Sequence, residues 1–239
     1  MKLRTFYSEL AYLAGVVLLA LGTSCASAAN FGLSMVVAPA YLIHLKLSPI
    51  WPVVTFGVAE YIVQAVLLLV LSLAMRRFRP YYLFSFCTAL LYGRILDGFL
   101  ALWALVPALT MLPRILIFAM GVLSVALGVS FVLHTYLSPE VYELVVKEVS
   151  ARYHLPSHRV KTVYDCSSLV VSLIMTTAFF GLSQLRGLGW GTLVCALATG
   201  TCVGWFNRRL EARFQFRTAF PKLEKFFAPN FPSSPTKNK

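Results

Sequence analysis

Charge is scarce in this 239-residue sequence, and negative charge is scarcest. Only 13% of the residues are charged, with nine Asp and Glu against 21 Lys and Arg, while 59% are hydrophobic. A soluble domain of this length would expose more apolar surface than one core could cover. The composition therefore excludes an ordinary soluble domain and predicts a polytopic membrane protein.

Motifs for metal binding, redox chemistry and catalysis are also missing. None of the five cysteines forms a Cys-x-x-Cys pair or stands beside a histidine at metal-ligand spacing, so we interpret them as small buried hydrophobes. The glycine-rich run 187–192 lacks the strand before it and the lysine after it that a phosphate-binding loop needs. We therefore expect no enzyme activity, no cofactor and no metal ion.

Long apolar runs, separated by basic residues, are what the sequence has in abundance. Six of these runs are long enough to cross a bilayer as helices. The first could be mistaken for a signal peptide, but we expect it to be retained because an internal segment repeats it. The predicted spans are 10–29, 52–75, 82–106, 112–134, 162–183 and 188–206.

The positions of the basic residues predict the orientation. With the N-terminus placed in the cytoplasm, 17 Lys and Arg fall in cytoplasmic segments and three in external segments, and Arg94 lies within a span. Loops on the cytoplasmic side carry such an excess. We therefore expect a protein of the bacterial inner membrane with both termini in the cytoplasm.

The apolar sequence repeats after about 106 residues. Six of twelve positions agree between 13–24 and 119–130, and 85–99 aligns with 192–206 so that Gly93 matches Gly200. A unit of three spans is odd, so the second unit enters the membrane from the opposite side. The predicted fold is an all-α membrane protein with six transmembrane helices in two inverted three-helix repeats, 1–107 and 108–206, and a basic cytoplasmic tail, 207–239.

The connectors inside each unit differ from ordinary loops. Residues 30–50 are too apolar for a loop and are interrupted by Asn30 and Pro39, so they predict an unwound or re-entrant segment before a short helix. Residues 138–155 predict a short amphipathic helix on the cytoplasmic surface. The aromatic and basic tail predicts contact with anionic lipid headgroups rather than nucleic acid.

Three motifs carry a resemblance to a known family. They are the run Asn30-Phe-Gly-Leu-Ser-Met-Val-Val-Ala-Pro-Ala-Tyr, the step Thr55-Phe56-Gly57-x-x-Glu60, and Gly187-x-Gly-x-Gly-Thr192 before the last span. With them, most of residues 10–206 resemble the YczE/YitT group of bacterial integral membrane proteins. The resemblance implies a duplicated unit and no known activity. The first half departs from the pattern, because Pro80-Tyr-Tyr stands where the second half has glycines.

Ionisable side chains within spans are costly, so each needs an explanation. Glu60 and Gln64 share one face of the second span. Glu60 is either hydrogen-bonded to a facing hydroxyl or broken-helix amide, or it is a proton or cation site facing the break at 30–39. Arg94 and Asp97, three residues apart, can form either a structural ion pair or a pair that a substrate breaks. Asp165 begins the fifth span, where a carboxylate is tolerated.

These side chains suggest a transporter of a small solute or ion with a cavity between the inverted units. The predicted site residues are Asn30, Pro39, Glu60, Gln64, Arg94, Asp97 and Asp165. The alternatives are a substrate-capture subunit of a multi-component transporter and a non-transporting scaffold or sensor. Beyond the bilayer, the partners expected are anionic lipids, and a homo-oligomer remains open.

Overall fold

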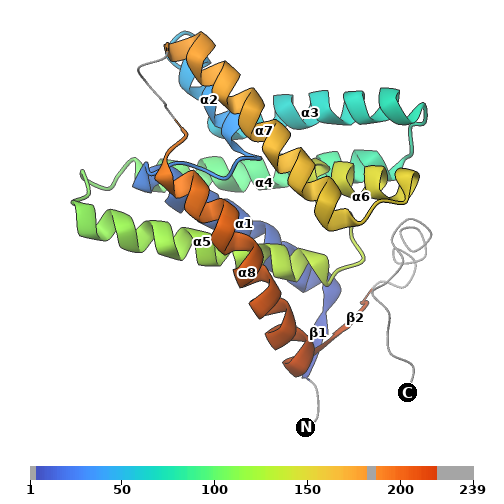
Figure 1. Cartoon of the computed structure of the whole chain (residues 1–239). Helices are drawn as coiled ribbons and strands as arrows, with labels where there is room; N and C mark the ends of the chain where they lie inside the picture. Colours follow the sequence, from blue (N-terminus) through green and yellow to red (C-terminus); the bar gives the residue numbers. More distant parts are fainter. Residues whose placement is uncertain (1–3, 182–186, 220–239) are drawn as a thin grey trace.

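The computed structural model describes residues 4–181 and 187–219, which are helical apart from two short strands. The helices are α1 (Ser8–Ala29), α2 (Ala38–Leu47), α3 (Phe56–Met75), α4 (Tyr81–Trp103), α5 (Met111–Leu133), α6 (Val141–Tyr153), α7 (Ser157–Phe180) and α8 (Trp190–Arg213), and the strands are β1 (Arg4–Tyr7) and β2 (Phe214–Arg217). In Figure 1, α7 and α8 run obliquely to α1, α3, α4 and α5.

Five of the helices are long and apolar enough to cross a membrane. They are α1, α3, α4, α5 and residues Arg159–Phe180 of α7. This confirms the membrane class, and it confirms that five of the six predicted spans are helices long and apolar enough to cross a membrane. The sixth predicted span, 188–206, is helical but is not among the five. Its helix, α8, contains several Gly and Thr residues and continues past 206 into charged sequence as far as Arg213. A crossing by α8 therefore stays a prediction.

The centre of the molecule is the crossing of α1 and α5. A Cβ atom added to Gly22 would lie 2.6 Å from the carbonyl oxygen of Gly121, and one added to Gly15 would lie 3.0 Å from that of Gly128. The two helices are antiparallel, because the earlier glycine of α1 meets the later glycine of α5. Only residues without a side chain allow backbones this close. The glycines at matching positions of the two segments therefore let α1 and α5 pack closely against each other.

Both connectors lead into short helices that start inside the protein. Asn30 ends α1 in the left-handed conformation, at φ 55°, and the chain stays non-helical until α2 begins with buried residues. After α5, the segment 134–140 leads to α6, whose Val141 is fully buried and whose Tyr142 is nearly so. The chain is thus non-helical between α1 and α2, and a re-entrant course of residues 30–50 stays a prediction.

In place of the predicted amphipathic helix 138–155 the structure has the shorter helix α6, and its position on the cytoplasmic surface stays a prediction. Its apolar residues, such as Val141 and Leu144, are buried, but α6 packs on α3, α4 and α7 rather than lying free on the surface. The first turn of a helix carries backbone N–H groups without a partner in the helix, and Gln64 of α3 accepts a hydrogen bond from one of them, the Val141 amide.

The segment after α8 pairs with the start of the chain. β1 and β2 are parallel, with Arg4 opposite Phe214, and Phe6 stacks on Phe131 of α5 with ring centroids 5.8 Å apart. Residues 207–219 of the predicted tail therefore complete α8 and form β2, and residues 220–239 lie outside the described residues. We call the end of the bundle that holds β1 and β2 the strand end, and the end where α1 finishes the opposite end.

We predict that Gly22→Val lowers the stability of the folded protein by about 1–3 kcal/mol, because the added methyls collide with α5. Gly200→Val is the control, since a Cβ there meets nothing within 4 Å. Melting curves of the purified proteins in detergent, read by size-exclusion chromatography, compare the two. Equal melting temperatures would contradict the close crossing.

Candidate functional site

The start of α3 is fixed by α4. Thr55 caps α3 by accepting a hydrogen bond from the Val58 amide at 3.2 Å. Asp97 of α4 accepts one from the Thr55 hydroxyl at 2.6 Å and one from the Gly57 amide at 2.8 Å. A carboxylate at a helix N-terminus is favourable, so Asp97 holds α3 in place.

The predicted ion pair of Arg94 with Asp97 is not formed. Across residues 4–181 and 187–219, the ion pairs found do not include one between these two side chains. Arg94 is exposed on α4, whereas Asp97 turns to the start of α3. The reason is that Asp97 has a nearer set of donors in the first turn of a neighbouring helix, which spacing along α4 does not reveal.

Glu60 and Gln64 lie one turn apart in the buried face of α3. Both side chains are 0% exposed. The Gln64 amide nitrogen donates a hydrogen bond to Glu60 Oε2 at 3.3 Å, as their shared face predicts. Two polar side chains without solvent contact need partners from other helices.

Those partners come from the start of α6. The Tyr142 hydroxyl donates to Glu60 Oε2 at 2.6 Å, and the Val141 backbone amide donates to Gln64 Oε1 at 3.2 Å. The sequence suggested that Glu60 is hydrogen-bonded either to a facing hydroxyl or to a backbone amide at a break in a helix. Glu60 has such a hydroxyl, that of Tyr142, and its neighbour Gln64 has such an amide, that of Val141. The connector that they face is the second one, after α5, and not the break at 30–39.

Not every oxygen at this place has a partner. In the described residues, four buried side-chain oxygens accept no hydrogen bond, and three belong to carboxyl groups: Glu60 Oε1, Glu140 Oε1 and Asp165 Oδ1. Glu140 is the N-cap residue of α6 and is partly buried. Asp165, on α7, lies near Lys161 and Glu143. Sequence reasoning missed Glu140 and Tyr142, although the helix-start chemistry of 138–140 was a signal for both.

The environment makes ionisation of Glu140 unfavourable. Its pKa is raised well above the usual value, first because burial disfavours the charge and then because Glu60 and Glu143 repel it. The pKa of Tyr142 is raised for the same reasons, burial first and Glu60 next. Strongly shifted groups that share a buried site are candidates for function.

More hydroxyl groups surround this pair of glutamates. Tyr92 of α4 donates to the Thr23 hydroxyl of α1 at 2.9 Å. Tyr12 of α1 shares a hydrogen bond with Thr88 of α4 at 2.5 Å, and Thr88 donates to the backbone oxygen of Ser138 at 3.2 Å. The second connector therefore enters a polar core built by α1, α3 and α4.

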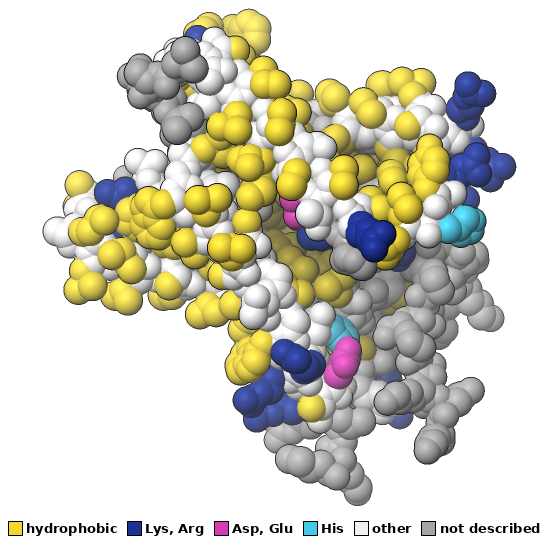
Figure 2. All heavy atoms as spheres, in the orientation of Figure 1, with side chains coloured by type: hydrophobic (Ala, Val, Ile, Leu, Met, Phe, Trp, Pro, Cys, Tyr) yellow, Lys and Arg dark blue, Asp and Glu magenta, His cyan; other side chains and the backbone are white. Residues whose placement is uncertain are grey.

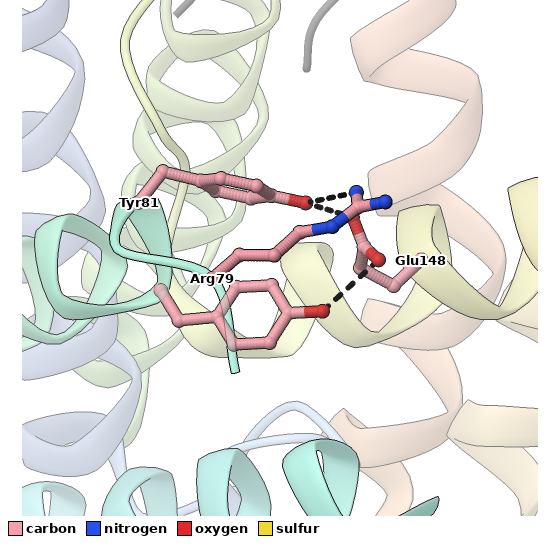
Figure 3. A network of polar contacts seen from close by, with 4 residues as sticks. Arg79, Tyr81 and Glu148 are labelled. Carbon is pink, nitrogen blue, oxygen red and sulfur yellow. Dashed lines mark hydrogen bonds and ion pairs between the residues drawn. The ribbon is translucent and has the colours of Figure 1, made fainter. Parts of the chain in front are cut away.

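At the strand end, this core is covered by a tyrosine and glutamate network (Figure 3). Tyr81 and Tyr82, at the start of α4, donate to the two carboxylate oxygens of Glu148 on α6, the second at 3.0 Å. Arg79 donates to the Tyr81 hydroxyl at 3.2 Å and pairs with Glu148 at 3.5 Å. Only 14% of the Glu148 side chain is exposed. The network ties the first half of the chain to the second.

At the opposite end, backbone groups make the corresponding contact. Gly191 donates its amide hydrogen to the Phe31 carbonyl at 2.9 Å, and Leu33 donates to the Gly187 carbonyl at 3.1 Å. Gly32 has φ 112°, and a Cβ there would lie 2.5 Å from Thr192 Oγ1. Two of the motifs that carry the family resemblance therefore pack against each other.

Asn30 and Pro39 belong to this opposite end and not to the glutamate site. Asn30 lines two open pockets, of about 520 and 440 Å³, and its backbone oxygen accepts a hydrogen bond from Arg114 at 3.4 Å. Pro39 is buried in the first turn of α2. The structure thus brings together Glu60 and Gln64 of the seven predicted residues, places Asp165 nearby on α7, and separates the other four. Among the described residues, no group of three His, Cys, Asp or Glu could hold a metal ion.

Apolar helices around a buried polar core define the class: this is a polytopic membrane protein. Residues 6–208 match a family of unknown function (DUF6198), so the chain belongs to that family. No curated protein and no solved structure matches the chain. The match agrees with an uncharacterised family, and the narrower resemblance to the YczE/YitT group stays a prediction.

We predict that Tyr142→Phe lowers the free energy of unfolding by about 1–3 kcal/mol, because Glu60 loses its shortest hydrogen bond in a buried place. Tyr153→Phe is the control on the same helix, where the side chain is 62% exposed. Combined with Glu60→Gln, the loss should be smaller than the sum of the two single losses, because the two side chains interact. Additive losses in melting experiments would contradict the pairing.

Proposed function

We propose that the protein transports a small solute or ion across the bacterial inner membrane, at a site formed by Glu60, Gln64, Glu140 and Tyr142. The observation that carries the proposal is Glu60, which is fully buried and keeps one oxygen without a partner where the two halves of the chain meet. Structural carboxylates such as Asp97 use both oxygens. A buried ionisable group left incomplete within a membrane protein suggests transport.

The pattern of helix contacts supports the inverted repeat. α1 packs on α4 as α5 packs on α8, α2 packs on α3 as α6 packs on α7, and α2 meets α7 as α6 meets α3. If each of the helices α1, α2, α3 and α4 is exchanged with α5, α6, α7 and α8 respectively, each of these contacts becomes its counterpart. The antiparallel crossing of α1 and α5 is the relation that oppositely oriented units require.

Among the described residues two interfaces break this symmetry, α4 with α6 and α3 with α4, and the larger one, α3 with α4, suggests the motion. α3 packs closely on α4, where Gly93 lies against Tyr61 and Gly57, but in the described residues α7 and α8 have no comparable interface. Gly200, the repeat counterpart of Gly93, has nothing within 4 Å. Figure 2 shows a hollow between α7 and α8 in which acidic atoms are visible. We infer that α7 packs on α8 in a second state, which gives alternating access, while Asp97 keeps the start of α3 on α4.

The two end contacts are suited to act as gates. The Glu148 network closes the strand end, and the backbone contact between Gly191 and Phe31 closes the opposite end. We place the strand end in the cytoplasm because the excess of basic residues lies on that side, where anionic lipid headgroups attract it. We assign no reaction to the protein.

We predict that wild-type protein in proteoliposomes produces electrical currents on a solid-supported membrane with at least one member of a panel of amino acids, sugars, nucleosides and organic ions. Glu60→Gln should abolish the current, because it changes the site without changing its shape. Glu211→Gln is the control, because Glu211 is 64% exposed and lies at the end of α8. Full current in Glu60→Gln would refute the assigned role.

A second prediction tests the motion. In a variant without native cysteines, Ser167→Cys and Gly200→Cys together should be joined by a short bifunctional maleimide in a fraction of the molecules, since repeat symmetry pairs these positions as Tyr61 pairs with Gly93. Electrophoretic mobility detects the product after proteolytic cleavage between the two positions. Each single-cysteine variant controls for links between molecules. No product under any substrate condition would contradict the rocking of α7 towards α8.

A further inference from the structure

Acidic residues are rare in this basic chain, yet four of the nine gather where α3, α6 and α7 meet. Glu60 comes from α3, Glu140 and Glu143 from the start of α6, and Asp165 from α7. Glu140 lies close enough to Glu60 and Glu143 for their charges to repel its own. Glu143 likewise repels a negative charge on Asp165. We call these four residues the acidic cluster.

Positive charge at the acidic cluster is insufficient to balance it. Lys161 of α7 pairs with Glu143 at 2.8 Å and also acts on Asp165. Among the described residues, the groups that act on Glu60 and Glu140 are carboxyls, tyrosines and amides, with no cation among them. On α2, His44 bonds to the Val54 carbonyl and Lys46 to the Phe179 carbonyl. Glu60 and Glu140 are therefore left without a counter-charge.

The tyrosines around the acidic cluster do not supply that charge. Tyr92 of α4 donates to Thr23, and Tyr12 of α1 is bonded to Thr88. Tyr142 of α6 donates to Glu60 Oε2, and Tyr164 of α7 lies near Asp165. These hydroxyls leave Glu60 Oε1, Glu140 Oε1 and Asp165 Oδ1 without partners. A buried carboxylate oxygen that accepts nothing is costly, and protonation of the carboxyl removes that cost.

We propose that the acidic cluster is a proton site, in which Glu60 and Glu140 together hold a proton that is released and rebound as the transporter changes state. The coupling of this proton to a change of state rests on the proposed function, whereas proton binding at the acidic cluster does not require transport. The proton enters by way of the Glu140 carboxyl, which belongs to a partly exposed residue although its Oε1 is buried. It then moves to Glu60 Oε1, where a new O–H bond forms as the one on Glu140 breaks.

The geometry favours a proton over a metal ion. A hard cation such as Ca²⁺ requires six or more oxygen ligands, or several bound waters. Here Glu60 Oε2 and Gln64 Oε1 already accept hydrogen bonds, and the unpartnered oxygens belong to three side chains on three elements. A proton needs one such oxygen.

The stability of the protein should therefore depend on pH in a defined direction. The pKa of Glu140 is raised by burial and by its acidic neighbours. A carboxyl with a raised pKa in the folded state stabilises the protein at low pH, and this stabilisation is lost as pH rises through the raised pKa. The melting temperature of the wild type should thus rise when pH is lowered from about 8 to about 5.

The test measures the proton on the full-length protein in detergent. Infrared difference spectra between about pH 8 and about pH 5 should show the carbonyl stretch of a protonated carboxylic acid, shifted in heavy water. Glu60→Gln or Glu140→Gln should remove or reduce this band and flatten the melting curve against pH. Glu60→Asp should keep the band at a shifted position, which separates loss of the acid from misfolding. Glu211→Gln is the control for the infrared readout and should leave the band unchanged, because Glu211 lies outside the acidic cluster at the end of α8.

Three results would overturn the proposal. They are a wild type without the band, a band unchanged in both glutamine variants, and a melting temperature that responds to Na⁺ or K⁺ at constant ionic strength but not to pH. A band without any transport current would refute the proposed function and leave the proton site standing. A current without the band would refute the proton site alone.

Discussion

The close crossing of α1 and α5 is the constraint from which the rest of the structure follows. Glycine faces backbone at both contact points, so the two helices approach closely, and the order of the paired glycines shows that they are antiparallel. The connectors that follow them therefore leave from opposite ends of the bundle. Each connector turns inward to a short helix, and α6 comes to lie beside Glu60 on α3.

The polar interior follows from a second constraint, the need of every buried donor and acceptor for a partner. α6 starts within the protein, so its first amides need acceptors, and Gln64 supplies one. Asp97 accepts a hydrogen bond from an amide at the start of α3, and both of its carboxylate oxygens have a partner. Glu60 and Glu140 differ because each keeps an oxygen without a partner. This difference, more than the presence of a carboxylate, separates a site from a structural contact.

The two ends of the bundle are held by different chemistry, which explains a departure visible in the sequence. At the opposite end, glycines let residues 187–191 approach the backbone of Phe31. At the strand end, where the first half has Pro80-Tyr-Tyr instead of glycines, two tyrosine hydroxyls reach Glu148 on α6. A polar side-chain contact at the strand end thus stands where the opposite end has a backbone contact.

The sequence by itself determined the membrane class, five of the spans and the shared face of Glu60 and Gln64. These features are local, since length, hydropathy and helical periodicity depend on residues close together in the chain. Tertiary structure alone decided that Asp97 caps α3 and does not pair with Arg94, that α6 packs on α3, α4 and α7, and that Glu140 and Tyr142 lie beside Glu60. These contacts join residues about 40 to 80 positions apart, and which donor lies nearest to a carboxylate is known only after the helices have packed.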